Sequence, residues 1–434
     1  MNNDLKTLAK KLGLAEIERF KQEVSSYNTS FVADKLKQTE VTHNSGIAFR
    51  VINNGRFGFA SGYGLCNEEA TLAKAKDLSK FYPKSLVQFP SGITVSESHE
   101  MFDVGDVFSD FKLKGYELMD YIRTRINSNS VLIDLSFDLT DSKEIIENSN
   151  NLYYSTIKRL NSFSINLRET LENDFIEIFS AVTENKKLDF VECVDEVIRL
   201  FNHSKKHAEI KSTHMPVLFS SRAAKELISL VELALSGKQV NQSSSPWSDS
   251  LGKKVLDSKI SLTQDPSYGC MARSIDDEGV PVQLLHLISN GVLENFYYDL
   301  QTAAKSSLNV SSTGNGFKSS LSALPEPELL NVIVKPGTKT LDEIIKSIDY
   351  GLYVDQTIGG LSSNISGDIA VNVDLGFLIE KGEIVGRVKN TMISGNVYNA
   401  LSNVIELSSS IKEYWSSVYN PDMLLDGFIV TSDD

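Results

Sequence analysis

Residues 216–237, PVLFSSRAAKELISLVELALSG, decide how the second half of this 434-residue chain is expected to fold. The first four residues of the stretch are apolar and predict a short buried strand. Apolar residues then recur at helical spacing between positions 223 and 235, and Gly237 marks the end of the predicted helix. Ser220 or Ser221 can cap this helix through its side-chain oxygen. We therefore expect a strand followed directly by an amphipathic helix.

The distribution of glycine and proline divides the chain on either side of this stretch. Neither residue occurs between Tyr116 and Met215, whereas both are frequent from Pro216 onward. Frequent turn residues indicate short strands joined by tight turns, and their absence favours long regular elements. We place a domain boundary near residues 211–215. Three regions are expected: an N-terminal unit at 1–100, a central unit at 101–212 and a β-rich C-terminal domain at 213–434.

The first two regions follow a similar order of helix, strands and helix. In the N-terminal unit we expect helices at 4–14 and 68–81 around strands at 46–52 and 57–60, with a hairpin turn at Asn54-Gly55. In the central unit we expect helices at 104–126 and 190–203 around strands at 131–139, 143–147, 152–167 and 175–182. Each unit also carries an Asn-Ser pair before a long strand, which an internal duplication or chance can explain.

The C-terminal domain is expected to consist mainly of β-structure. Predicted strands lie at 284–288, 292–298, 331–334 and 370–377, and short helices at 341–348 and 397–405. Residues 380–383, EKGE, predict a hairpin turn. The whole chain is therefore predicted to be of the α+β class, with two helix–strand–helix units built on antiparallel sheets and a β-rich C-terminal domain.

Composition narrows the class of protein. Apolar residues make up 41% and charged residues 23% of the chain, as in ordinary globular proteins. The formal net charge of −14 argues against nucleic-acid binding, which needs clustered Lys and Arg, and fits an acidic surface that favours solubility. Cys66, Cys193 and Cys270 are widely spaced and predict free thiols in a reducing compartment. With no apolar run near the roughly 18 residues of a membrane span and no signal-peptide pattern, we expect a cytoplasmic protein.

Four polar motifs that contain glycine follow one another in the last third of the chain. They are DDEG at 276–279, STGN at 312–315, SGD at 366–368 and ISGN at 393–396, with Gly382-Glu383-Ile384 between the last two. Together with Arg50-Val51, GRFGFA at 55–60 and Leu235-Ser236-Gly237, this ordered set resembles the TldD/PmbA family. The resemblance covers essentially the whole chain. Members of this family were once described as modulators of DNA gyrase and are better regarded as cytoplasmic metalloproteases.

The resemblance implies a metal site in the catalytic members of the family but not in this chain. Those members carry a His-Glu-x-x-x-His motif on the helix after the first C-terminal strand, where two imidazoles bind Zn²⁺ and the glutamate activates water. Aligned through Leu235-Ser236-Gly237, the motif falls on Ile228, Ser229 and Leu233. Catalytic members also use a late cysteine ligand, and no cysteine follows Cys270. The chain thus resembles the PmbA (TldE) branch, the non-catalytic partner.

Membership of that branch implies a subunit that pairs with a zinc-bearing TldD-type metalloprotease. The complex would act on peptides or unfolded proteins threaded into a cavity enclosed by two subunits. The chain itself would hold no cofactor, would be inactive alone, and would bind a peptide as an added strand. Two alternatives stay open: a self-sufficient peptidase with an unidentified site, and a non-proteolytic homodimer that binds peptides or regulates. We expect no nucleic-acid or membrane partner.

The motifs supply the candidates for substrate binding. Their small residues let two backbones approach closely, and their polar side chains offer hydrogen bonds. The candidates are Thr313, Asn315, Ser366, Asp368 and Asn396. They line a peptide groove in one interpretation and form purely structural turns in the other. No residue is assigned as catalytic.

Three further groups invite a chemical interpretation. His203 and His207 could share a metal on one helix, but two intervening lysines oppose this and a solvated helix end explains the pair. Adjacent carboxylates at 276–278 point to opposite faces of an extended segment, so a turn at Gly279 explains them better than acid–base chemistry. The serines at 243–245 lack a positioned base, which favours a mobile surface loop over a nucleophile.

Overall fold

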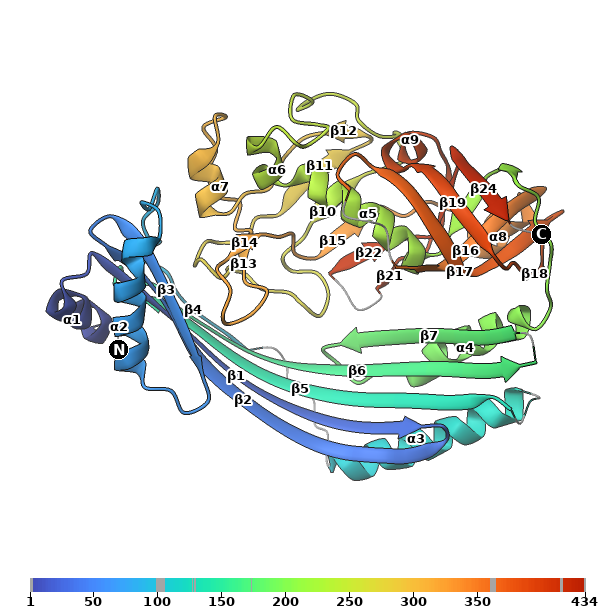
Figure 1. The fold of residues 1–434 in the computed structure, drawn as a ribbon, viewed down its shortest axis with the longest axis horizontal. Coiled ribbons are helices and arrows are strands. Elements are labelled where there is room, and N and C mark those ends of the chain that lie inside the picture. The colour runs from blue at the N-terminus through green and yellow to red at the C-terminus, as the bar shows by residue number, and fades with distance from the viewer. Residues whose placement is uncertain are drawn as a thin grey trace.

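The computed structural model describes residues 3–98, 106–126, 128, 130–172, 174–359, 364–413 and 417–432, and it confirms the α+β class (Figure 1). The N-terminal half is built on one seven-stranded sheet in the order β3-β2-β1-β5-β6-β4, with β7 also paired to β6. Its strands are β1 (Glu16–Val32), β2 (Lys35–Asn53), β3 (Arg56–Tyr63), β4 (Thr94–Ser98), β5 (Leu132–Asn148), β6 (Tyr153–Leu171) and β7 (Asp174–Glu184). Because β1 pairs with β5, strands from both predicted units share this sheet. All neighbours are antiparallel except β4, which runs parallel to β6.

Helices cover one face of this sheet. The apolar sides of α3 (Val107–Arg125) and α4 (Phe190–Ser204) join a core with the aromatic residues of β5 and β6. The ring centre of Phe137 lies 5.3 Å from that of Phe111 and 5.4 Å from that of Phe190. Burying such a side chain contributes roughly 1.5–3 kcal/mol. At the other end of the sheet lie α1 (Asn3–Leu12), α2 (Glu68–Leu78) and the 3₁₀ helix that follows α2 (Ser79–Phe81).

The opposite face of the long strands is polar in part. Side chains alternate between the two faces of a strand, so residues in register across neighbouring strands form rows on one face. Two such rows cross β1, β5 and β6: Asn28–Asp138–Ser162 and Val24–Ser142–Lys158. The Asn28 side chain donates a hydrogen bond to Oδ1 of Asp138 at 2.7 Å. The long strands thus present an apolar face to the helices. Their other face is polar in these two rows and apolar in the row Phe20–Ile146–Tyr154, which packs against the C-terminal half.

The C-terminal half contains two larger sheets and a two-stranded one, and it lies along the long strands in Figure 1. The nine-stranded sheet has β8 (Thr213–His214), β9 (Val217–Phe219), β16 (Tyr350–Ile358), β17 (Asp368–Glu380), β18 (Glu383–Arg387), β19 (Thr391–Asn396), β20 (Val404–Leu407), β23 (Met423–Leu425) and β24 (Phe428–Ser432). The six-stranded sheet has β10 (Leu262–Gln264), β11 (Leu285–Ser289), β12 (Val292–Leu293), β15 (Val332–Val334), β21 (Lys412–Glu413) and β22 (Val418–Asn420). The short pair is β13 (Gly316–Phe317) and β14 (Glu326–Pro327).

Helix α5 (Ser221–Leu235) packs against strands of both larger sheets and forms the centre of the C-terminal core. Four shorter helices complete the described part of this half: α6 (Gly237–Asn241), α7 (Leu300–Lys305), α8 (Leu341–Lys346) and α9 (Val397–Leu401). The strand–helix order predicted from residues 216–237 is therefore confirmed as β9 followed by α5.

Most predicted elements are present, with three differences. The strands expected at 131–139 and 143–147 form the single strand β5, and only Val292–Leu293 of the strand expected at 292–298 is β-structure. The helix expected at 397–405 ends at Leu401 and is followed by β20. The two predicted hairpin turns are confirmed at Asn54-Gly55 and Lys381-Gly382, where every residue has a positive φ. The expected helix start at 104 and the boundary between 100 and 101 lie outside the described residues.

Candidate functional site

The first two polar motifs pack against each other. The carboxylate of Asp276 accepts hydrogen bonds from the backbone N–H groups of Glu278, Val280 and Gly316, at 2.9, 2.8 and 2.8 Å. A buried carboxylate that is bound by three backbone donors fixes the shape of its loop. The structure therefore favours the turn interpretation of 276–279, with Asp276 joining this turn to β13.

Thr313 and Asn315 lie in the segment that Asp276 holds. Oγ1 of Thr313 donates to Oδ1 of Asn315 at 2.6 Å. Asn315 is fully buried, and its Nδ2 donates to Oε1 of Gln264 at 2.7 Å and to the carbonyl of Glu328 at 2.8 Å. Thr313 therefore orients the side chain of Asn315, and Asn315 holds the backbone of the 328–330 segment in place.

The other three candidates form a second group, where β17 begins and β19 ends. Asp368 and Asn396 face each other in the pairing of these strands. Oγ of Ser366 donates to Oδ2 of Asp368 at 2.8 Å, and Nδ2 of Asn396 donates to Oδ1 of the same carboxylate at 2.9 Å. The five candidates thus fall into two hydrogen-bonded groups, Thr313 with Asn315 and Ser366 with Asp368 and Asn396.

Helix α5 carries Ile228, Ser229 and Leu233, the positions at which the family resemblance places the metal motif. Ile228 is fully buried in the C-terminal core, and Oγ of Ser229 donates to the carbonyl of Lys225 at 3.1 Å. Neither Ile228 nor Leu233 has an atom that can donate an electron pair to a metal. Across the described ranges, no group of three or more His, Cys, Asp or Glu side chains could hold a metal ion. These three positions therefore do not fit a zinc ion.

The same helix carries an ionisable residue that sequence reasoning missed. Burial raises the pKa of Glu232 to about 8, and the negative charge of Glu328 adds to this effect. Burial also raises the pKa of Glu328. Glu232 lies three residues from Ser229 on the helix, and the isolated sequence gives no signal that it faces a second carboxylate from the segment after β14.

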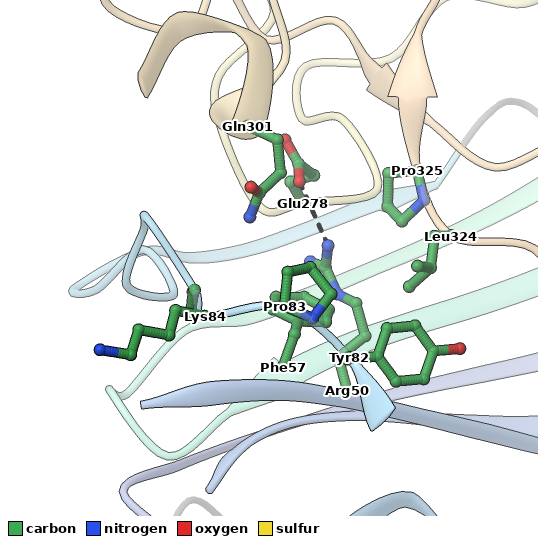
Figure 2. Close-up of a pocket in the computed structure, with 10 residues that line it drawn as sticks. Arg50, Phe57, Tyr82, Pro83, Lys84, Glu278, Gln301, Leu324 and Pro325 are labelled. Atoms are coloured by element: carbon green, nitrogen blue, oxygen red, sulfur yellow. Dashed lines mark hydrogen bonds and ion pairs between the residues drawn. The ribbon is translucent and has the colours of Figure 1, made fainter. Parts of the chain in front are cut away.

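A small pocket separates the N-terminal sheet from the DDEG turn (Figure 2). It encloses about 180 Å³, and Arg50 and Glu278 meet at its base. Nε and Nη2 of Arg50 donate to the carboxylate of Glu18 at 2.6 and 2.7 Å, and Nη1 donates to Glu278 at 3.2 Å. The apolar lining comes mainly from Phe57, Tyr82, Pro83, Leu324 and Pro325. This pocket is called the Arg50 pocket below.

A larger cavity of about 610 Å³ opens between the polar face of β5 and β6 and the loops of the C-terminal half. Its charged lining residues are Glu144, Lys158, Arg273, Asp277, Lys318 and Glu328. We call it the lysine cavity. A third hollow of about 720 Å³ shares Phe317 and Glu328 with the lysine cavity and shares Tyr82 and Leu324 with the Arg50 pocket. The three hollows are therefore neighbours along one seam between the sheet and the C-terminal half.

The charged side chains of the lysine cavity form ion pairs, and the pKa values of its two lysines are lowered. Nη2 of Arg273 lies 3.0 Å from Oδ1 of Asp277, and its Nη1 lies 3.6 Å from Oε2 of Glu144. Burial, followed by repulsion from Arg273, lowers the pKa of Lys158 to about 8. Burial, followed by repulsion from Arg50, lowers the pKa of Lys318 to about 8. A cavity of this size with buried ions on its walls suits a ligand with both polar and apolar parts.

The two other groups that the sequence singled out, the histidines at 203 and 207 and the serines at 243–245, do not come together as a chemical site. Helix α4 ends at Ser204, so His207 lies beyond the helix that carries His203, and Nε2 of His207 is 2.8 Å from Oδ2 of Asp174. Oγ of Ser245 is buried and donates to the carbonyl of Ala234 at 2.6 Å. The segment after Ser244 is thereby fixed to the end of α5, which differs from the mobile loop that the sequence suggested.

The fold and its cavity can now be compared with known proteins. Two family models match the chain: PmbA/TldA metallopeptidase C-terminal domain over residues 212–432, and PmbA/TldA metallopeptidase domain 1 over residues 20–77. The chain therefore belongs to the TldD/PmbA family of metallopeptidases, as the sequence motifs indicated. Across the described ranges, no helix has the length and apolar character needed to cross a membrane.

Individual relatives agree with this assignment. The chain is 25% identical to a metalloprotease PmbA homologue from Haemophilus influenzae, over 96% of this chain and 92% of the relative. It is 33% identical to a metalloprotease TldD homologue from Buchnera aphidicola, but that match spans 50% of this chain and only 44% of the relative. The crystal structure of TldE from Thermococcus kodakarensis has the same fold, with a TM-score of 0.88 and 21% identity over 99% of both chains.

Proposed function

We propose that this chain is the PmbA/TldE-type subunit of a TldD-type zinc metalloprotease that acts on peptides or unfolded proteins. The proposal is supported by Ile228, Ser229 and Leu233, which stand where the family resemblance places the metal motif, in a chain that belongs to the family. The subunit would contribute binding surface, and the zinc and the activated water would come from the TldD-type partner. Three free cysteines suit the cytoplasm as the place of action.

The seam of three hollows is the proposed path of the peptide. It combines an apolar pocket at Arg50 with the charged walls of the lysine cavity. An extended peptide can also add to a sheet as a further strand. Strand β3 pairs only with residues 46–53 of β2, so residues 35–45 of β2 have an outer edge that no other strand covers in the described part of the chain. Thr313 and Asn315 would support the path from behind, and Ser366, Asp368 and Asn396 are proposed as a second contact region.

The test combines metal analysis with peptidase assays. The purified chain is analysed for bound zinc and assayed on an unfolded protein, alone and mixed with a TldD-type protein from the same cells. We expect no stoichiometric zinc in this chain, no cleavage by it alone, and more cleavage by the mixture than by the TldD-type protein alone. Native mass measurement of the complex from its own cells should show both subunits together.

Two other outcomes would support the alternatives. One zinc per chain together with cleavage by the isolated protein would overturn the proposal in favour of a self-sufficient peptidase. Peptide binding by a homodimer that forms no complex with a TldD-type protein would favour a non-proteolytic binding or regulatory protein.

A further inference from the structure

We propose that Lys158 and Lys318 form a site in the lysine cavity for a carboxylate group of the bound peptide. The inference rests on the proposed function, since it assumes that this cavity receives peptides. It adds a substrate class: peptides that carry an acidic side chain, or a free C-terminal carboxylate, at the position that reaches this cavity.

Lys158 has a buried ammonium group with no ion-pair partner in the part of the chain that the structure describes. The residue is 9% exposed and lies in the first third of β6, in the row Val24–Ser142–Lys158. Its Nζ donates to the carbonyl of Met271 at 3.3 Å, and no carboxylate oxygen of a described residue lies within 4.0 Å of it. One main-chain carbonyl satisfies only one of the three N–H donors of an ammonium group.

Lys318, on the opposite wall of the lysine cavity, also has a buried ammonium group that lacks a partner among the described residues. Its Nζ is buried, has no hydrogen-bond partner among the described residues, and lies 4.0 Å from the ring centre of Phe20 on β1. Its backbone N–H donates to Oδ2 of Asp277 at 2.8 Å, which fixes the segment that carries the side chain. The aromatic ring offers a cation–π contact but no hydrogen-bond acceptor comparable to an oxygen.

Two carboxylates of the cavity wall, Asp277 and Glu144, are already engaged. Asp277 is ion-paired with Arg273 and accepts the backbone N–H of Lys318. Glu144 accepts a hydrogen bond from Nε2 of Gln22 at 3.1 Å and lies near Arg273. Among the described residues, neither ammonium group has an ion pair with these two carboxylates or with Glu328, the third carboxylate of the lining.

A ligand that pairs with the two ammonium groups must be an anion that accepts hydrogen bonds. An unpaired buried ion is costly, and a carboxylate that enters beside it regains charge-assisted hydrogen bonds. The lowered pKa values of both lysines are consistent with ions that lack a partner. In a cavity that receives peptides, the carboxylate comes from an Asp or Glu side chain or from the C-terminus.

The test measures the affinity of the whole protein for four fluorescent, unstructured ten-residue peptides. They differ only in a central Glu or Gln and in a free or amidated C-terminus. We expect the amidated Gln peptide to bind about 10-fold more weakly than a peptide with the preferred carboxylate, as the loss of one charge-assisted contact predicts. If the Glu peptide with an amidated C-terminus binds tightly, the carboxylate comes from the side chain. If the Gln peptide with a free C-terminus binds tightly, it comes from the C-terminus.

The variants Lys158→Met and Lys318→Met should each remove this preference. Both keep an apolar stem of similar length, so affinity for the amidated Gln peptide should not change. Because each variant removes an unpaired buried charge, its melting temperature should equal or exceed that of the wild type. The matched control is Lys143→Met, which removes an exposed lysine from the opposite face of neighbouring β5 and should leave the preference intact.

The possible outcomes separate this inference from the proposed function. Equal binding of all four peptides by the wild type, or an unchanged preference in both lysine variants, would overturn the carboxylate site and leave peptide binding intact. Failure of every peptide to bind would overturn peptide binding by this chain and the carboxylate site together. Loss of preference in Lys143→Met as well would show a general charge effect, which also contradicts the site.

Discussion

At the scale of single residues, the hydrogen-bond partners of buried ions separate structural groups from groups that await a ligand. Asp276 accepts three backbone N–H donors within the chain, so the oxygens of its carboxyl group are used in shaping a loop, and burial raises its pKa. Lys158 and Lys318 have almost no such partners. The hydrogen bonds of Asp276 thus favour the turn that the sequence indicated at 276–279, and two lysines outside the four polar motifs are further candidates for binding.

Glu232 provides a prediction about pH and stability. Its pKa rises from 4.5 to about 8 in the folded protein, so folding favours its protonated form. The stabilising contribution of that proton is complete below pH 4.5 and is lost as pH rises through 8. The variant Glu232→Gln should therefore be more stable than the wild type by on the order of 1 kcal/mol at pH 8, and no more stable at pH 4.5.

Urea unfolding at both pH values measures this difference. Glu69→Gln, which changes an exposed glutamate in the first turn of α2, is the control and should show no comparable gain at pH 8. A stability change for Glu232→Gln that is the same at both pH values would contradict a raised pKa for this residue.

At the scale of elements, the start of α5 shows how the structure decides between two residues that the sequence could not separate. Ser220 is the N-cap, and its Oγ accepts the backbone N–H of Ala223 at 3.3 Å. Oγ of Ser221 is buried and has no hydrogen-bond partner among the described residues. Either serine is a good cap by residue type, and the backbone of Ser220 outside the helix makes the difference.

The two serines give a matched pair of variants. Ser220→Ala should lower the free energy of unfolding by about 1 kcal/mol, because one N–H at the helix start loses its acceptor. Ser221→Ala should be neutral or slightly stabilising, because it removes a buried hydroxyl without a partner. Thermal or urea unfolding of both variants measures the contrast. Equal losses would mean that the hydroxyl of Ser221 makes a contact equivalent to the cap.

The elements that the sequence predicts well are those defined by local signals. Helices α3, α4 and α5 have regular apolar spacing, and the two hairpin turns have residues suited to positive φ. The sequence predicts a break in β5 at residues 140–142, because three consecutive polar residues resemble a turn when the neighbouring strands are unknown. In the folded chain they continue the strand, since β1 and β6 pair with them on either side.

The candidate site was harder to predict because its parts come from distant segments. The motifs at 276–279 and 312–315 were found from the sequence, but their contact with each other depends on the hydrogen bond between Asp276 and Gly316. Lys158 and Lys318 are ordinary lysines in the sequence. Their lack of counter-ions becomes visible only when β6 and the segment after β13 are placed around one cavity.

At the scale of the whole molecule, two ion clusters join the N-terminal sheet to the C-terminal half at its two ends. Arg50 of β2 links Glu18 of β1 to Glu278 of the DDEG turn. At the far end, Asp174 of β7 contacts two cations, Nη2 of Arg387 at 2.6 Å and Nζ of Lys389 at 2.9 Å, and also Nε2 of the His207 imidazole at 2.8 Å. The lysine cavity therefore lies between two points at which ion pairs connect the N-terminal sheet to the C-terminal half.

The Asp174 cluster predicts an acid-sensitive connection. Burial acts to raise the pKa of Asp174, but hydrogen bonds from Arg387 and Lys389 outweigh it and hold the pKa well below its usual 3.8. The stabilising contribution is present above pH 3.8 and is lost as pH falls below it. Asp174→Asn should therefore reduce stability by on the order of 1 kcal/mol at pH 7, and the difference from wild type should shrink below pH 3.8.

Hydrogen exchange localises the effect of this variant. Amide exchange at pH 7 should speed up in β7 and in the 206–208 segment, which bonds to Arg387 through its backbone. Exchange around Arg50 should stay as in the wild type. Asp249→Asn, which changes an exposed carboxylate in the loop after α6, serves as the control. Uniform acceleration throughout the chain would contradict a local connection.

The burial of Ile228 also bears on how this lineage can change over time. A histidine there would place an imidazole inside an apolar core cluster, at a cost of about 1–3 kcal/mol if a buried nitrogen stayed unbonded. Two more substitutions, at Ser229 and Leu233, would be needed before the helix could hold a metal, so the first step brings a loss without a gain. Zinc binding at these three positions would therefore require several coordinated substitutions, the first of which lowers stability.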